Sequence, residues 1–320
     1  MDIDISAITD SVIAAGNVCR RVQSEMVSAD TVEKKDRSPV TVADYAAQAV
    51  ICRTLSSVCP DIPVVAEEGT ENLRLPSQEY MRRRLRRFLP DWSETEILAA
   101  IDRGSRSPGT RFFTLDPIDG TKGFLRGGQY AQALALIENG RVVMGWLGCP
   151  NLDGTKGGAP GVVLTAERGA GGIAAGFDGA PLGPLKIADA GNDTPVRFLE
   201  SVESGHSNHA LQERVFSHFG DQGKILRVDS QVKYAMLGLG RGDIYLRLPA
   251  PASPDYREKI WDHAAGALMV ETAGGVVSDA GGRALDFTCG RQLLKNRGIV
   301  AASEAYHARV MAVLGSQFRG

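Results

Sequence analysis

Two aspartates separated by two residues follow a short apolar run in this 320-residue chain, in the string Asp116-Pro117-Ile118-Asp119-Gly120-Thr121. At the end of a strand the two carboxylates can converge on one point, and the carbonyl of Ile118, kept out of a helix by the proline, can add a third oxygen. All-oxygen ligation is what Mg²⁺ prefers. Gly120 permits a tight turn, and Thr121 can open a helix whose N–H groups face an anion. The string therefore predicts that a hard cation and a phosphate meet here.

Aspartates followed by Gly-Thr are also common in ordinary turns and helix caps. The longer string from Leu115 to Arg126 is more specific, and further motifs accompany it along the chain. They are Lys35 to Tyr45, Val64 to Glu68, and Ile260 to Gly266 followed by Glu271 to Gly275. With these motifs the chain resembles the lithium-sensitive, Mg²⁺-dependent phosphatases related to inositol monophosphatase, and within them the 3′(2′),5′-bisphosphate nucleotidases. Ala66 stands where that family often has glycine or serine, and no motif is evident from Ser77 to Pro108.

The composition is that of a single soluble enzyme. Hydrophobic residues make up 43% and charged residues 23% of the chain, and the net charge of −2 argues against a general nucleic-acid or membrane binder. The acidic N-terminus has neither a basic start nor a long apolar run, so no signal peptide or membrane span is expected. Five scattered cysteines without a C-x-x-C pair indicate reduced thiols, and none lies in a nucleophile motif. We expect a cytoplasmic monomer without nucleic-acid or membrane partners.

Helical spacing of apolar residues predicts helices at 5–26 and 42–58, and a short strand at 64–66 follows. A further helix is expected where an apolar stripe alternates with arginines. The stripe consists of Met81, Leu85, Phe88 and Leu89. We interpret the arginines as a solvated helix face rather than a nucleic-acid patch.

Apolar, strand-like runs then follow at 112–115, 131–138 and 142–147. The last two are joined by Asn139-Gly140, a strong signal for a β-hairpin. Another strand is expected at 162–166, after a glycine-rich loop.

A domain boundary is expected near residues 190–194, where polar turn residues precede an apolar run. The pattern before it predicts an α+β domain, residues 1–193, which carries most of the candidate metal ligands. Strands and helices alternate after it, which predicts an α/β domain, residues 194–320, with the nucleotide contacts and Asp262. The resemblance implies layered α/β/α/β/α packing of these elements.

Four carboxylates can point into one cleft in this arrangement. They are Glu67 after one strand, Asp116 and Asp119 after another, and Asp262 at the start of a helix expected from Trp261 to Ala273. Without cations they would repel one another strongly. Two Mg²⁺ ions, held by these groups and the carbonyl of Ile118, would remove that cost, clamp an ester phosphate and lower the pKa of a bound water. The resemblance singles out Glu67 rather than its neighbour Glu68 as the ligand.

Asp44 and Thr121 are the candidates for activating the attacking water. A carboxylate hydrogen-bonded to a threonine hydroxyl can hold and deprotonate such a water, whereas Asp44 alone could equally be an ordinary residue at a helix N-terminus. The family match favours the catalytic interpretation. No Ser-His-Asp order or phosphohistidine motif competes with it, so a covalent mechanism is not needed.

The second half of the chain contains the candidate substrate contacts. Segments 205–207, 229–234 and 243–249 resemble the parts of bisphosphate nucleotidases that hold adenosine phosphate. A second phosphate needs a cation, which Lys233 or Arg247 could supply. Further contacts are expected from His206, Ser230, Thr121 and Asp262. Taken singly, a histidine is more often structural, and a lysine or arginine is more often a solvated charge.

The resemblance implies hydrolysis of 3′-phosphoadenosine 5′-phosphate to AMP and phosphate, with 3′-phosphoadenylyl sulfate as a second substrate. Two alternatives remain at this point. One is a phosphatase of inositol mono- or polyphosphates, which shares the metal core, and the other is a catalytically silent nucleotide sensor. The pair Asp44 and Thr121 argues against silence, because a pure binder does not require water activation.

Overall fold

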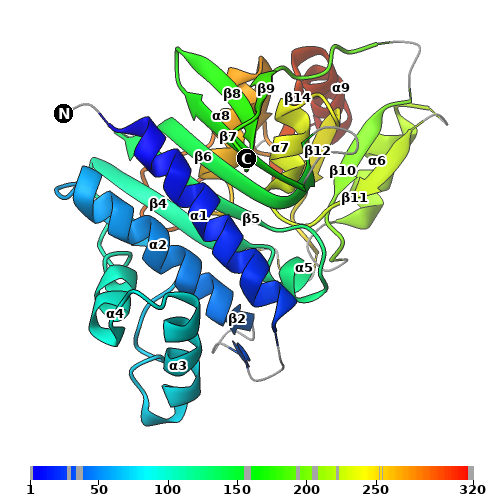
Figure 1. The fold of residues 1–320 in the computed structure, drawn as a ribbon. Helices are drawn as coiled ribbons and strands as arrows, with labels where there is room; N and C mark the ends of the chain where they lie inside the picture. Colours follow the sequence, from blue (N-terminus) through cyan, green and yellow to red (C-terminus); the bar gives the residue numbers. More distant parts are fainter. Residues whose placement is uncertain are drawn as a thin grey trace.

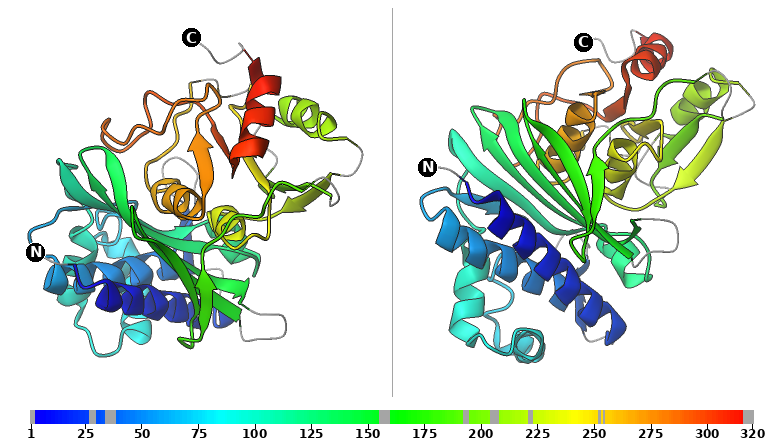
Figure 2. Two further views of the ribbon diagram at one scale, coloured as in Figure 1. Left: turned by 90° about the horizontal axis from the view of Figure 1, so that it is seen from above. Right: turned by 45° about the horizontal axis from the view of Figure 1, so that its top comes forward.

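A computed structural model describes residues 3–26, 30–33, 39–154, 160–191, 195–203, 208–220, 223–251, 253 and 255–315. These residues form five layers (Figure 1). Two long N-terminal helices cover one face of a seven-stranded sheet, and two shorter helices separate this sheet from a five-stranded sheet. Two more helices cover the outer face of the second sheet (Figure 2). The layered α/β/α/β/α arrangement implied by the resemblance is therefore confirmed.

The first layer consists of α1 (Ile5–Ser24) and α2 (Val42–Val58). Asp4 caps α1, and Thr41 forms a reciprocal capping box with Asp44 at the start of α2. The predicted bounds of α2 are confirmed, whereas α1 ends two residues before the predicted 26. Although α1 has 20 residues, neither it nor any other helix in the described residues is apolar and long enough to cross a membrane.

The seven-stranded sheet has the order β3-β4-β5-β6-β7-β8-β9. Its strands are β3 (Val64–Ala66), β4 (Arg111–Asp119), β5 (Ala131–Glu138), β6 (Arg141–Asp153), β7 (Pro160–Glu167), β8 (Gly171–Gly176) and β9 (Pro181–Pro184). β3 and β4 are parallel, and each later neighbouring pair is antiparallel. Asn139 and Gly140 both have positive φ (48° and 74°), as a two-residue I′ turn requires, so the predicted hairpin is confirmed.

The stretch without a recognisable motif forms η2 (Pro76–Gln78), α3 (Glu79–Phe88) and α4 (Glu94–Asp102). Both α3 and α4 contact α2. The predicted apolar stripe of α3 is buried. The prediction of a solvated arginine face is wrong for Arg84, whose side chain is only 11% exposed and donates to both carboxylate oxygens of Asp30, at 2.7 and 2.6 Å. Asp30 lies just before β1 (Thr31–Glu33), which pairs with β2 (Pro39–Thr41).

The five-stranded sheet is mixed and has the order β11-β10-β12-β14-β13. Its strands are β10 (Arg197–Glu200), β11 (Lys224–Arg227), β12 (Ile244–Arg247), β13 (Gly275–Ser278) and β14 (Ile299–Ser303). β10 is parallel to β11 and β12, and β14 is antiparallel to β12 and β13. The helices between the sheets are α7 (Val232–Gly238) and α8 (Ala264–Thr272), and those outside are α6 (His209–Ser217) and α9 (Glu304–Leu314). The predicted boundary between residues 193 and 194 lies outside the described residues.

The start of α8 corrects the prediction that a helix begins at Trp261. The residues before Ala264 form a turn, and His263 has a non-helical backbone with φ −138°. Its ring is hydrogen-bonded on both sides, to Tyr234 at 2.8 Å and to Glu258 at 3.2 Å. These tertiary contacts delay the helix and leave the preceding residue, Asp262, in the turn.

Candidate active site

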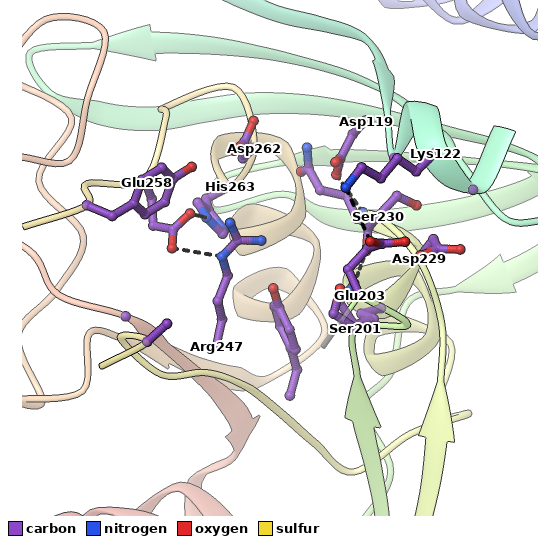
Figure 3. Close-up of a pocket in the computed structure, with 18 of the residues that line it drawn as sticks. Asp119, Lys122, Ser201, Glu203, Asp229, Ser230, Arg247, Glu258, Asp262 and His263 are labelled. Atoms are coloured by element: carbon purple, nitrogen blue, oxygen red, sulfur yellow. Dashed lines mark hydrogen bonds and ion pairs between the residues drawn. The ribbon is translucent and has the colours of Figure 1, made fainter. Parts of the chain in front are cut away.

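A cavity of about 460 Å³ lies where the ends of strands from both sheets meet (Figure 3). Because β3 and β4 are parallel, their carboxyl ends lie at the same edge of the sheet, and the N–H of Glu67 donates to the carbonyl of Leu115 at 3.0 Å. Glu67, Asp119 and Asp262 therefore reach one cavity from three separate segments.

An irregularity in β4 separates its two aspartates. Three residue steps from Asp116 to Asp119 oppose only two steps of β5. Pro117 has no N–H for the ladder, and a bulge of this kind re-aims the side chains beside it. Asp119 lines the cavity, and its Oδ2 accepts the backbone N–H of Gln231 at 2.6 Å. The irregularity between the two aspartates therefore turns the Asp119 side chain toward the cavity.

Asp116 is the most buried of the four carboxylates that are candidate metal ligands, with 2% of its surface exposed. Burial raises its pKa, and Glu67, Asp119, Asp262 and Asp44 raise it further. Burial and neighbouring charges also raise the pKa of Asp262. Among the described residues no donor reaches Asp116 Oδ1. Carboxylates that repel one another around an unpartnered buried oxygen fit a divalent cation, because the cation would supply the missing positive charge.

Thr121 is the first residue of α5 (Thr121–Leu125). Its hydroxyl lies 3.4 Å from Asp44 Oδ1 and 3.2 Å from the carbonyl oxygen of Ile118. Asp44 Oδ2 instead accepts from the backbone N–H and the hydroxyl of Thr41, at 2.8 and 2.7 Å. One oxygen caps α2 and the other faces Thr121.

Lys233 and Arg247 also line the cavity, on elements of the second sheet and its inner helices. Lys233 is 3% exposed, and its ammonium donates to the carbonyls of Val228 and Ser230 at 3.0 and 2.7 Å. Burial lowers the pKa of Lys233 from its usual 10.5 to about 8, although Asp119 acts in the opposite direction. This lysine is therefore a desolvated cation in the cavity wall, not a solvated surface charge.

Salt bridges join α5 to the second sheet at the edge of the cavity. Lys122 lies 3.3 Å from Glu203, and Arg126 lies 2.6 Å from Glu203 and 2.9 Å from Asp229. Because the Lys122 and Arg126 side chains are about half exposed, we expect each pair to contribute at most about 1 kcal/mol. Since Lys122, Glu203 and Asp229 line the cavity, they connect its two walls.

The structure brings nearly all predicted site residues together. The cavity wall includes Glu67, Asp119, Thr121, Ser230, Lys233, Arg247 and Asp262. Asp44 and Ile118 contact the Thr121 hydroxyl, and Asp116 lies near enough to Glu67, Asp119 and Asp262 for their charges to raise its pKa. His206 lies outside the described residues. Glu258 and His263 also line the cavity, and no role was predicted for either of them. His263 lies within the motif Ile260 to Gly266 and Glu258 two residues before it, which is the signal that could have suggested a role.

The layered fold and the carboxylate cavity define a class of metal-dependent phosphatases. The sequence model of the inositol monophosphatase family matches residues 3–317, and the chain belongs to this family. The family resemblance recognised from the motifs is thereby confirmed.

Individual relatives refine this placement. A 3′(2′),5′-bisphosphate nucleotidase of Schizosaccharomyces pombe is 39% identical over 327 residues, which cover 96% of this chain and 92% of the relative. A protein of the same name from Oryza sativa is 38% identical over 326 residues, covering 94% and 90%. Among solved structures, the extragenic suppressor protein suhB from Bartonella henselae aligns over 97% of both chains with a TM-score of 0.67. At 21% identity this last similarity shows the shared fold.

Proposed function

We propose that this chain is a Mg²⁺-dependent 3′(2′),5′-bisphosphate nucleotidase that converts 3′-phosphoadenosine 5′-phosphate to AMP and phosphate. The observation that carries the proposal is one cavity with a buried carboxylate group and two cations, Lys233 and Arg247. A substrate with two phosphates can use both, whereas an inositol monophosphate has no second phosphate for the cations. The names of relatives at 38–39% identity support the same activity. 3′-Phosphoadenylyl sulfate carries the same 3′-phosphate and is proposed as a second substrate.

Glu67, Asp116, Asp119 and Asp262, together with the carbonyl of Ile118, would hold the Mg²⁺ ions. When bound, Mg²⁺ would neutralise the charge that develops on the phosphate and lower the pKa of the attacking water. The protein's part is to fix the oxygens through the end of β3, the irregular part of β4 and the turn before α8.

Asp44 and Thr121 prepare the attacking water. The Thr121 hydroxyl positions the water. Asp44 Oδ1 lies 3.4 Å from that hydroxyl and accepts the proton that the water loses. Because Thr41 holds Asp44 Oδ2 with two hydrogen bonds, the other oxygen keeps its orientation toward Thr121. Asp44 is 1% exposed, so bulk solvent does not compete for this position.

Substrate recognition involves both parts of the chain. Thr121 and Asp262 contact the reacting phosphate, and Lys233 and Arg247 bind the second phosphate. Ser230 and His206 complete the predicted contacts with the sugar and phosphates. We assign these contacts to an α/β domain of residues 194–320 and most metal ligands to an α+β domain of residues 1–193. We also propose that the chain is a monomer and that it is cytoplasmic; the five unpaired cysteines fit a reducing compartment.

Release of inorganic phosphate tests the proposal directly. The purified protein is given 3′-phosphoadenosine 5′-phosphate, AMP, inositol 1-phosphate or inositol 1,4-bisphosphate, each with Mg²⁺ and with a chelator. We expect release from the bisphosphate nucleotide, little release from AMP, and none with chelator. Preference for an inositol phosphate would favour the polyol phosphatase, and nucleotide binding without release would favour the silent sensor.

A further inference from the structure

Arg247 is held by a chain of hydrogen bonds that leads away from the cavity. Its Nε donates to Glu258 Oε1 at 2.7 Å, and His263 Nε2 lies 3.2 Å from Glu258 Oε2. On the far side of the imidazole, Tyr234 Oη lies 2.8 Å from His263 Nδ1. Figure 3 shows Glu258 and His263 on one side of the Arg247 guanidinium and Ser230 on the other. The three supporting side chains belong to residues no more than 8% exposed.

The chemistry of these groups fixes the direction of each hydrogen bond. Burial alone would raise the pKa of Glu258, but Arg247 and His263 lower it to about 2, so its carboxylate only accepts. His263 Nε2 must therefore be the donor in the bond to Glu258. Burial lowers the pKa of His263, which leaves the ring neutral, and its Nδ1 accepts the hydroxyl proton of Tyr234. Donors occupy both oxygens of Glu258 and so fix the plane of the carboxylate.

We propose that Glu258 is a positioning residue, which holds Arg247 through Nε so that the Nη groups face the second phosphate of the substrate. This inference rests on the proposed function, because it requires Arg247 to bind a phosphate. Arginine has several rotatable bonds, and a side chain restricted before binding loses less entropy when the ligand arrives. Tyr256, which also lines the cavity, is hydrogen-bonded to Arg247 and restricts the guanidinium from a second direction.

A metal site does not explain this cluster. One ligand atom from each of Glu258, Asp262 and His263 lies within 4.8 Å of the others, as in many metal centres. However, Arg247 and His263 occupy both oxygens of Glu258, and both ring nitrogens of His263 are engaged. The arrangement is therefore complete as a support for Arg247.

The chain contains a matched control in Arg197 and Asp243. Arg197 donates from Nε and Nη2 to the two carboxylate oxygens of Asp243, at 2.9 and 2.7 Å. This arginine-carboxylate pair joins the starts of β10 and β12, in the sheet that also carries Arg247, and neither member lines the cavity. Although Asp243 is the first residue of the segment 243–249, it lies outside the cavity wall, so Asp243→Asn reports what the loss of a comparable pair does to the fold alone.

The experiment compares steady-state kinetics of the Mg²⁺-loaded enzyme on two substrates. They are 3′-phosphoadenosine 5′-phosphate and adenosine 3′-phosphate, which lacks the second phosphate. In Glu258→Gln we expect KM for the bisphosphate to rise about tenfold, with kcat within about threefold of wild type. KM for adenosine 3′-phosphate should stay unchanged, as should both KM values in Asp243→Asn. In an Arg247→Ala background, Glu258→Gln should cause no further loss, because it acts through the missing arginine.

Three results would overturn the inference. The first is an equal rise in KM for both substrates in Glu258→Gln. The second is a further rise in KM when Glu258→Gln is added to Arg247→Ala. The third is wild-type KM values in Glu258→Gln although Arg247→Ala raises KM for the bisphosphate alone. If Arg247→Ala itself fails to discriminate, the fault lies in the proposed role of Arg247 and hence in the proposed function. Should Glu258→Gln not fold, Tyr234→Phe removes one hydroxyl from the same chain. An unchanged KM ratio in that variant overturns the inference, and a raised ratio supports it.

Discussion

Titration of Lys233 should control nucleotide binding between pH 7 and 9. Because burial lowers its pKa to about 8, about nine-tenths of the molecules carry the ammonium at pH 7 and about one-tenth at pH 9. If only the charged form binds the second phosphate, KM for 3′-phosphoadenosine 5′-phosphate should rise about tenfold over this range, in inverse proportion to the charged fraction. The phosphates of the substrate, with a second pKa of about 6, are already ionised at pH 7 and add little.

The control is Lys233→Arg, whose guanidinium stays charged throughout this range. Whatever its absolute KM, this variant should show a KM for the bisphosphate that changes by less than about twofold from pH 7 to 9. Adenosine 3′-phosphate, which has no second phosphate, should give a flat profile with wild type. A flat wild-type profile for the bisphosphate, or the same rise in Lys233→Arg, would refute the argument.

Other predictions address the reacting phosphate. Asp119→Asn can still accept from Gln231 but loses a negative charge, so turnover should fall by at least about 100-fold, with a melting temperature no lower than that of the wild type because one repelling charge is removed; near-normal turnover would contradict the metal assignment. Asp44→Asn should lower turnover by about 100-fold while calorimetry shows unchanged Mg²⁺ and AMP binding; loss of Mg²⁺ binding would rule out its role with water. Li⁺, close to Mg²⁺ in size but with half the charge, should suppress phosphate release far more than K⁺ at equal ionic strength, and added substrate should not relieve it. Relief by substrate would indicate simple competition.

Local sequence signals predict the elements that carry most of the site. The bounds of α2 follow from the break at Pro39 and the cap at Thr41, and the β5–β6 hairpin follows from Asn139-Gly140. Short-range rules suffice there because the deciding contacts lie within a few residues. The predicted start of α8 was wrong because hydrogen bonds of the His263 ring decide where the helix begins. Their partners, Glu258 and Tyr234, lie five and 29 positions away in the sequence.

The same distinction applies to the candidate site. A compact motif contains Asp116, Ile118 and Asp119, so the sequence alone identifies them as a group. The burial of Lys233 and the support of Arg247 by Glu258 depend on how a β-strand, a helix and a turn pack together. No local pattern distinguishes such a cation from one in solvent, because the surroundings come from distant segments.

The energetics of the cavity give a reason for its unusual charges. A lysine whose folded pKa of about 8 lies below its usual 10.5 destabilises the folded state by about 3 kcal/mol at pH 7, a cost that disappears as the pH rises from about 8 to 10.5. The pKa values of Asp116 and Asp262 are raised in the folded state, so these carboxylates destabilise the fold at every pH above the pKa of an unfolded aspartate, which includes pH 7. Opposite charges offset these costs only in part: Asp119 opposes the lowering of the Lys233 pKa, and Arg247 opposes the raising of the Asp262 pKa. Lys233 donates to carbonyls, and Asp116 Oδ1 has no donor among the described residues. A cation at the carboxylates and a phosphate at the lysine would relieve both free-energy costs. The charges that destabilise the folded protein without ligands are therefore those that favour binding.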